Sequence, residues 1–134
     1  MEIMKEMIMR HEGLRLTPYR CSAGKLTIGY GRNLEEVGIS QEEAEYLLTD
    51  DIKRAWKEVL RIFPHYYSFS QNRQTALIDM MYNLGATKFR TFKKMIAAIK
   101  VDDWEEASRQ AEDSKWYHQV GQRGVEIKNM LRKG

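Results

Sequence analysis

Glu12 is the residue whose chemical type and place in the chain most readily support chemistry. It precedes a glycine-rich segment, and no other carboxylate lies between it and Glu35. A glutamate where a helix meets a cleft can be partly desolvated, and desolvation raises the pKa of a carboxyl group and lets it keep its proton. Such a group can protonate the leaving oxygen when a glycosidic bond is cleaved. An ion pair with Arg10 or Arg15 explains the residue equally well, so residue chemistry alone leaves both interpretations open.

Cys21, the only cysteine of the chain, lies within the same segment. A single cysteine forms no internal disulfide and excludes a cysteine-based metal cage. An ordinary thiol is mostly protonated at neutral pH, but Arg20 and Lys25 are close in sequence and could lower the pKa of this one. The alternative interpretation is a small buried apolar residue with no chemical role.

Two other patterns do not predict a site. Gly29-Tyr30-Gly31 lacks the third glycine and the following helix of a dinucleotide-binding loop, so it indicates backbone geometry only. The histidines show no metal-ligand spacing, and no metal site is predicted for His11, His65 and His118.

The composition limits the possible classes of protein. The chain has 134 residues and a formal net charge of +3, which suits loose attraction to an anionic polymer. Lys and Arg form no long basic arm, so we expect no nucleic-acid partner. No apolar run approaches the roughly 20 residues that span a bilayer, and we expect no stable membrane insertion. The N-terminal residues mix charged and apolar side chains, unlike a secretory signal, so synthesis is expected in the cytosol.

The N-terminal third is expected to hold one helix and a small sheet. Apolar residues at helical spacing predict a helix at residues 2–10, which His11-Glu12-Gly13 ends. Glycines, threonines and tyrosines between residues 14 and 39 predict a hairpin or a three-stranded sheet with its first turn at residues 22–25.

The rest of the chain is expected to be helical. Ser40 and Glu43 form a capping box that opens a long helix ending near residue 62. Ser70 can cap a helix at residues 71–84 that Gly85 ends. Apolar residues between 89 and 99 imply short helices, a second capping box (Asp102–Glu105) predicts a helix to about residue 112, and a last helix follows Gly121. The fold class is therefore α+β, mostly helical with a small N-terminal β-lobe.

The segment "HEGLRLTPYRCSAGKLTIGYGRN" resembles the catalytic segment of phage-type lysozymes. The family pattern is Glu-Gly-x-Arg at a helix end, a Tyr-rich strand, and then Gly-x-x-Thr-Ile-Gly-x-Gly. The matching residues are Glu12, Gly13, Arg15, Tyr19, Gly24, Thr27, Ile28, Gly29 and Gly31. The likeness continues in "TALIDMMYNLGATKF" and "SKWYHQVGQR". It implies one lysozyme-like domain over residues 1–134, with a β-lobe at about 13–39 and a helical lobe at about 40–134 on which the N-terminal helix packs.

The resemblance also implies roles for individual residues. Glu12 would be the proton donor, and the Thr27 hydroxyl would orient the attacking water. Arg123 would pair with Glu12 across the boundary between the lobes. Asn83 and Lys115 fall where the family contacts the sugar chain. No metal or organic cofactor is implied.

Cys21 departs from the family pattern, which usually has an aspartate at this position as the second catalytic residue. The thiol can act as a thiolate base or nucleophile. It can be a passive substitute beside Glu12 and a water held by Thr27, or it can mark an inactive site.

The function that the resemblance implies is a muramidase that cuts the β-1,4 bond between N-acetylmuramic acid and N-acetylglucosamine in peptidoglycan. A lytic transglycosylase is an alternative, because it can work with one acid. A catalytically silent wall-binding protein is another, because the second carboxylate is absent. We expect a monomer that is made in the host cytoplasm, needs a separate pore-forming protein for export, and acts at the bacterial cell wall.

Overall fold

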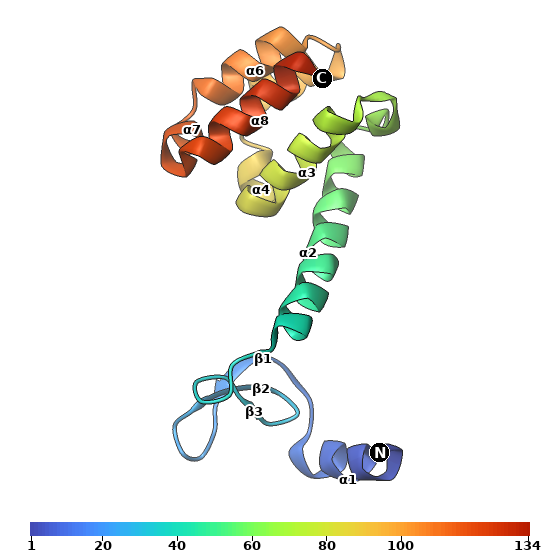
Figure 1. Ribbon diagram of the computed structural model, residues 1–134, viewed down its shortest axis with the longest axis vertical. Coiled ribbons are helices and arrows are strands. Elements are labelled where there is room, and N and C mark those ends of the chain that lie inside the picture. Colours follow the sequence, from blue (N-terminus) through green and yellow to red (C-terminus); the bar gives the residue numbers. More distant parts are fainter. The chain divides into compact units, whose positions relative to one another are not determined.

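The computed structural model describes residues 1–134, and the chain forms two compact units, residues 1–46 and 47–134. Eight α-helices and one three-stranded antiparallel sheet confirm the predicted fold class (Figure 1). None of the helices combines the length and the apolar character needed to cross a membrane.

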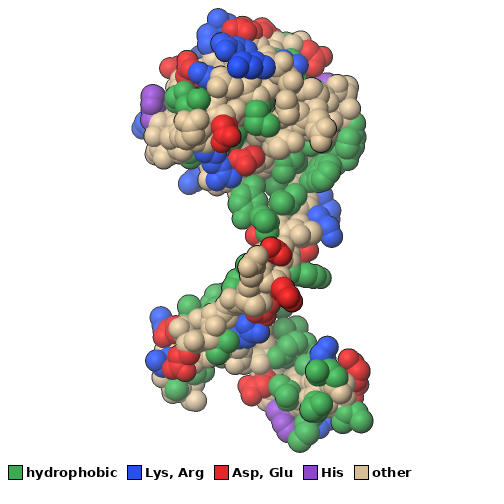
Figure 2. Space-filling model, in the orientation of Figure 1, with side chains coloured by type: hydrophobic (Ala, Val, Ile, Leu, Met, Phe, Trp, Pro, Cys, Tyr) green, Lys and Arg blue, Asp and Glu red, His purple; other side chains and the backbone are tan.

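The first unit begins with helix α1 (Glu2–Glu12), two residues longer than predicted and ended by Gly13 at a φ of 73°. Its apolar residues, among them Ile3 and Met7, stay exposed, and α1 has no buried residue. Figure 2 shows hydrophobic side chains on the surface of this helix. The expected packing of α1 on the helical lobe stays a prediction.

The sheet of the first unit has the order β1-β2-β3, with β1 (Arg15–Arg20), β2 (Leu26–Gly29) and β3 (Arg32–Asn33). Tyr19 faces Thr27 across β1 and β2, and the register shifts between Arg15 and Tyr19. Pro18 lies in this irregular stretch, where an edge strand tolerates a residue that has no N–H to donate. The turn at residues 22–25 is confirmed, since the Cys21 N–H donates to Lys25 O at 3.0 Å.

Helix α2 (Gln41–Ile62) begins in the first unit and continues into the second. Its predicted capping box is confirmed. The Glu43 N–H donates to Ser40 Oγ at 3.1 Å, and the Ser40 N–H donates to Glu43 Oε1 at 2.8 Å. These two bonds satisfy backbone donors at the helix start and fix where α2 begins.

The second unit continues with helices only. Helix α3 ends at Gly85 as predicted, and α8 lies alongside α6 in Figure 1. The elements after α2 are the 3₁₀-helix Tyr66–Ser68, α3 (Gln71–Leu84), α4 (Ala86–Phe89), α5 (Lys93–Lys100), α6 (Trp104–Glu112), α7 (Lys115–Val120) and α8 (Gln122–Lys133).

The hydrophobic core of the protein lies in the second unit. Its fully enclosed side chains come from α2, α3, α4, α5, α6 and α8 and from Phe63, which follows α2. They include Val59, Leu77, Met80, Phe89, Ile99 and Leu131. Aromatic rings meet edge to face within it, as for Phe69 and Trp104 with centroids 4.8 Å apart. In the first unit only Thr27 is buried, at 3% exposure.

The predicted start of helix α6 was wrong by one residue. Asp103, not Asp102, caps α6 by accepting from the Glu106 N–H at 3.1 Å. Asp102 adopts a φ of 57°, and the Asp103 N–H donates to Ala98 O at 2.8 Å. Asp102, whose backbone is in the left-handed region, thus ends α5. The N-cap of α6 is therefore one position later in the chain than predicted.

Candidate active site

Glu12 is the last residue of α1, and its side chain lies against Gly31. A Cβ atom placed on Gly31 would lie 2.5 Å from Glu12 Oε2 and 3.0 Å from its carboxyl carbon. Gly31 has a φ of 76°, a conformation that L-residues with side chains rarely adopt. The glycine therefore serves both the turn after β2 and the space for the acid.

The alternative interpretation of Glu12, an ion pair with a neighbouring arginine, is not found. Neither Arg10 nor Arg15 forms an ion pair with it. The Arg15 guanidinium instead lies over the Tyr19 ring, 4.5 Å from its centroid. The carboxyl group is thus not engaged by the two cations that flank it in sequence. The expected partial desolvation of Glu12 was wrong, because the residue is exposed.

Cys21 begins the turn between β1 and β2, with its side chain beside Thr27. Backbone hydrogen bonds from Lys25 and then Ala23 lower the pKa of the thiol, and a hydrogen bond with the Thr27 side chain acts in the same direction. Burial raises it, but less than the backbone bonds lower it. The turn therefore favours the thiolate, as backbone N–H groups do for anions.

The cause of this shift differs from the one expected from the sequence. Arg20 pairs with Glu35 at 2.6 Å and donates to Gly24 O, and Lys25 pairs with Glu36 at 3.5 Å. Both side chains are held by carboxylates. The backbone amides of the turn, rather than these cations, stabilise the thiolate.

Thr27 is positioned by the sheet and by its own hydroxyl. It pairs with Tyr19 across the strands, and Oγ1 donates to Lys25 O at 2.9 Å. The hydroxyl has one proton, which either Lys25 O or the Cys21 thiolate accepts, and in both arrangements its lone pairs can accept a hydrogen bond. Thr27 can therefore hold a water molecule as an acceptor, next to the Cys21 sulfur.

An ion pair that the sequence did not reveal ties β3 to the start of α2. The Arg32 guanidinium bonds both Glu43 oxygens, at 2.7 and 3.0 Å, and also donates to Gly38 O. The Arg32 bond, with the Ser40 N–H, lowers the pKa of Glu43 to about 2. The sequence identified Glu43 as the glutamate of the capping box. It did not reveal Arg32 as the second partner of Glu43, because the two residues lie eleven positions apart in the chain.

Arg123 forms its ion pair within the second unit. Its Nε donates to Asp79 Oδ1 at 2.7 Å, and Nη2 lies 3.4 Å from Asp79 O. Both residues line an apolar groove of about 510 Å³ together with Trp56 and Tyr66. Asp79 was not singled out from the sequence. The expected pair between Arg123 and Glu12, which belong to different units, stays a prediction.

Asn83 contacts Trp116, the residue that follows Lys115 in the chain. The Trp116 indole N–H donates to Asn83 Oδ1 at 2.8 Å, and Lys115 is the neighbouring residue, at the start of α7. Trp116 is buried, so Asn83 satisfies a polar group that would otherwise have no partner. The contact of Asn83 and Lys115 with a sugar chain stays a prediction.

The phage lysozyme family model matches residues 9–133. An endolysin of Acyrthosiphon pisum secondary endosymbiont phage 1 is 37% identical over 114 residues, which cover 82% of this chain and 74% of that protein. Probable T4-type lysozyme 1 of Dictyostelium discoideum is 26% identical, and the match covers 98% of this chain and 94% of that protein. The pre-baseplate central spike protein Gp5 of Enterobacteria phage T4 is 29% identical over 98% of this chain but 28% of its own length.

The chain therefore belongs to the phage lysozyme family. Membership supports a peptidoglycan-lytic enzyme of the lysozyme type.

Proposed function

We propose that this protein is an endolysin muramidase that hydrolyses the β-1,4 bond between N-acetylmuramic acid and N-acetylglucosamine. The observation that carries the proposal is the Glu12 carboxyl at the end of α1, set against Gly31 and paired with neither neighbouring arginine. An acid placed in this way can protonate the glycosidic oxygen as the bond breaks.

The hairpin of the same unit supplies the second half of the reaction. Thr27 Oγ1 accepts a hydrogen bond from a water molecule and turns that water's oxygen toward the anomeric carbon. As the water attacks, its proton passes to the Cys21 thiolate, while Glu12 delivers its own proton to the leaving sugar. The thiolate also places negative charge near the oxocarbenium-like transition state.

Substitution of Glu12 tests this assignment. Glu12→Gln keeps the shape of the side chain but removes the transferable proton, so lysis of purified peptidoglycan should fall by about a hundredfold or more. Glu6→Gln is the matched control, because Glu6 is an exposed residue of the same helix. Unchanged lysis by Glu12→Gln would overturn the assignment.

The role of Cys21 has its own test. Cys21→Ala removes the thiolate and should lower turnover by about tenfold to a hundredfold, whereas Cys21→Asp should keep most of it because a carboxylate is ionised at neutral pH. Full activity of Cys21→Ala would show that the sulfur has no part in the chemistry. Tight wall binding by the wild type without any soluble fragments would instead identify a silent binding protein.

A further inference from the structure

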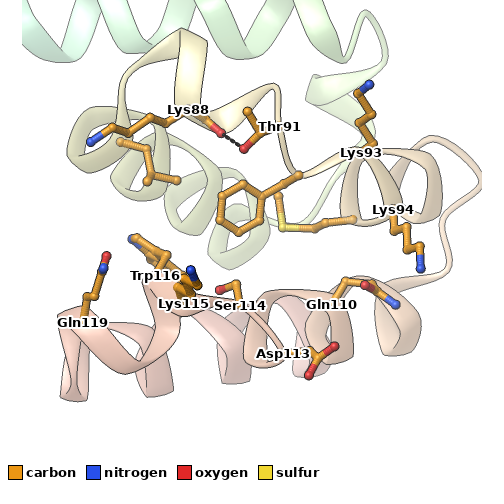
Figure 3. A pocket seen from close by; sticks show the side chains of 13 residues that line it. Lys88, Thr91, Lys93, Lys94, Gln110, Asp113, Ser114, Lys115, Trp116 and Gln119 are labelled. Carbon is orange, nitrogen blue, oxygen red and sulfur yellow. Dashed lines mark hydrogen bonds between the residues drawn. The ribbon is translucent and has the colours of Figure 1, made fainter.

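A groove of about 590 Å³ in the second unit carries an excess of cations. It runs between α4 and α5 on one side and α6 and α7 on the other, as Figure 3 shows. Four lysines line it: Lys88, Lys93, Lys94 and Lys115. The one acid among its lining residues is Asp113.

None of the four lysines is neutralised by an ion pair, and all four are exposed. The nearby carboxylate of Glu106 is bonded to Arg109 and Gln110, although the charge of Lys94 contributes to lowering its pKa. Ammonium groups that gather around one groove repel each other, and a bound anion relieves that repulsion.

The positions of these lysines are also unfavourable for the helices themselves. Lys93 and Lys94 are the first two residues of α5, whose N-cap has no side-chain hydrogen bond, and Lys115 is the first residue of α7. The start of a helix carries a partial positive charge, so cations there are destabilising. Helix stability therefore does not account for three of the four lysines.

The groove is elongated and its charges are spread along it. In Figure 3, Lys88 and Gln119 lie at one end, Lys93 and Lys94 at the other, and Lys115 between them. This spacing suits a linear ligand with several anionic groups better than a single small anion.

The chemistry of the lining favours phosphate over carboxylate or nucleic acid. No arginine lines the groove, and arginine is the side chain that recognises carboxylates through two parallel bonds. Lysine binds phosphate as a compact point charge with three donors. Two aromatic residues line the groove. Trp116 is 5% exposed and held by Asn83, and Phe92 is half-buried and meets the Trp116 ring edge to face at 6.3 Å, so neither offers a fully open face on which a base could stack.

We propose that this groove of the second unit binds the phosphate groups of a linear, polyol-phosphate wall polymer, a ligand chemically distinct from the glycan bond that Glu12 would cleave. The location of the polymer in the wall rests on the proposed function, but the binding itself needs no bond cleavage. The enzyme would thus be held on a phosphate-bearing wall by the face between α4–α5 and α6–α7.

The experiment measures binding of a fluorescent glycerol-phosphate oligomer to the full chain at low ionic strength. A variant with all four groove lysines changed to glutamine should bind about tenfold more weakly, since exposed ion pairs each contribute little. The control variant removes the same amount of charge from exposed lysines elsewhere in the second unit: Lys53→Gln, Lys57→Gln, Lys100→Gln and Lys133→Gln. It should change binding by less than about twofold.

Three results would overturn the proposal. The first is no binding of the oligomer by the wild type. The second is equal weakening in both variants, which would show that only the net charge matters. The third is tighter binding of poly-D-glutamate or duplex DNA of matched charge. Loss of binding here leaves the Glu12→Gln result untouched, so the two proposals fail separately.

Discussion

The Glu12 carboxyl occupies the space that a side chain on Gly31 would need. A Cβ atom there would lie 2.5 Å from Glu12 Oε2, closer than such atoms approach in proteins. The acid at the end of α1 and the turn between β2 and β3 therefore depend on each other.

Replacing Gly31 with alanine should displace the Glu12 carboxyl and lower lytic activity by about a hundredfold, the range that a misplaced catalytic group costs. Gly29→Ala is a matched control, because Gly29 has a φ of 71° but no atom within 4 Å of an added Cβ. Both variants carry backbone strain of about 1 kcal/mol or more. Equal activity loss in the two variants would attribute the effect to strain and not to Glu12.

Replacing Thr27 with valine should raise the pKa of the Cys21 thiol, because the hydroxyl is one of the groups that lower it. Less thiolate then exists at neutral pH, and alkylation by iodoacetamide slows at a pH below the ordinary thiol pKa. The measurement is the alkylation rate as a function of pH. Thr17→Val, at an exposed position of β1, should leave the profile unchanged. An unshifted profile for Thr27→Val would mean that the backbone hydrogen bonds alone lower the pKa of the Cys21 thiol.

The ion pair of Arg32 and Glu43 predicts a loss of stability in acid. Because the pKa of Glu43 is lowered to about 2 in the folded chain, its contribution is fully present above the unfolded value of about 4.3. That contribution disappears as the pH falls from there through about 2. Glu43→Gln should therefore lower the melting temperature at pH 7. Below pH 3, the difference in melting temperature between this variant and the wild type should become smaller. Glu42→Gln, on the neighbouring exposed residue, should show no such pH dependence.

Asn83→Ala should destabilise the second unit by about 1–3 kcal/mol, because the buried indole N–H of Trp116 loses its acceptor. Denaturant unfolding measures this change. The double variant with Trp116→Phe removes both partners, so its cost should be smaller than the sum of the two single changes. Additive costs would show that the 2.8 Å hydrogen bond contributes nothing.

Much of the fold was predictable because its signals are local. The capping box of Ser40 and Glu43, the glycine after α3 and the cap at Ser70 each act within a few residues. Helix α7 was missed because a helix of six residues holds too few turns for its apolar spacing to show. The cap of α6 was misplaced because nothing in the sequence marks Asp102 as left-handed.

The candidate site was only partly predictable, and the missing part is long-range or depends on the backbone. Glu12, Cys21 and Thr27 stand in one segment whose pattern is recognisable. The partners of Arg32 and Arg123 lie far along the chain, and residue types do not reveal such pairs. The amides that stabilise the Cys21 thiolate belong to the turn itself, so side-chain charges pointed to the wrong cause.

Product analysis in water labelled with heavy oxygen tests the central claim most directly. Purified peptidoglycan is digested by the wild type, by Glu12→Gln and by Glu6→Gln, and the soluble fragments are analysed by mass spectrometry. The muramidase assignment predicts reducing N-acetylmuramic acid ends that carry the label, from the wild type and Glu6→Gln but not from Glu12→Gln. Unlabelled 1,6-anhydro ends, or labelled ends produced equally well by Glu12→Gln, would contradict it.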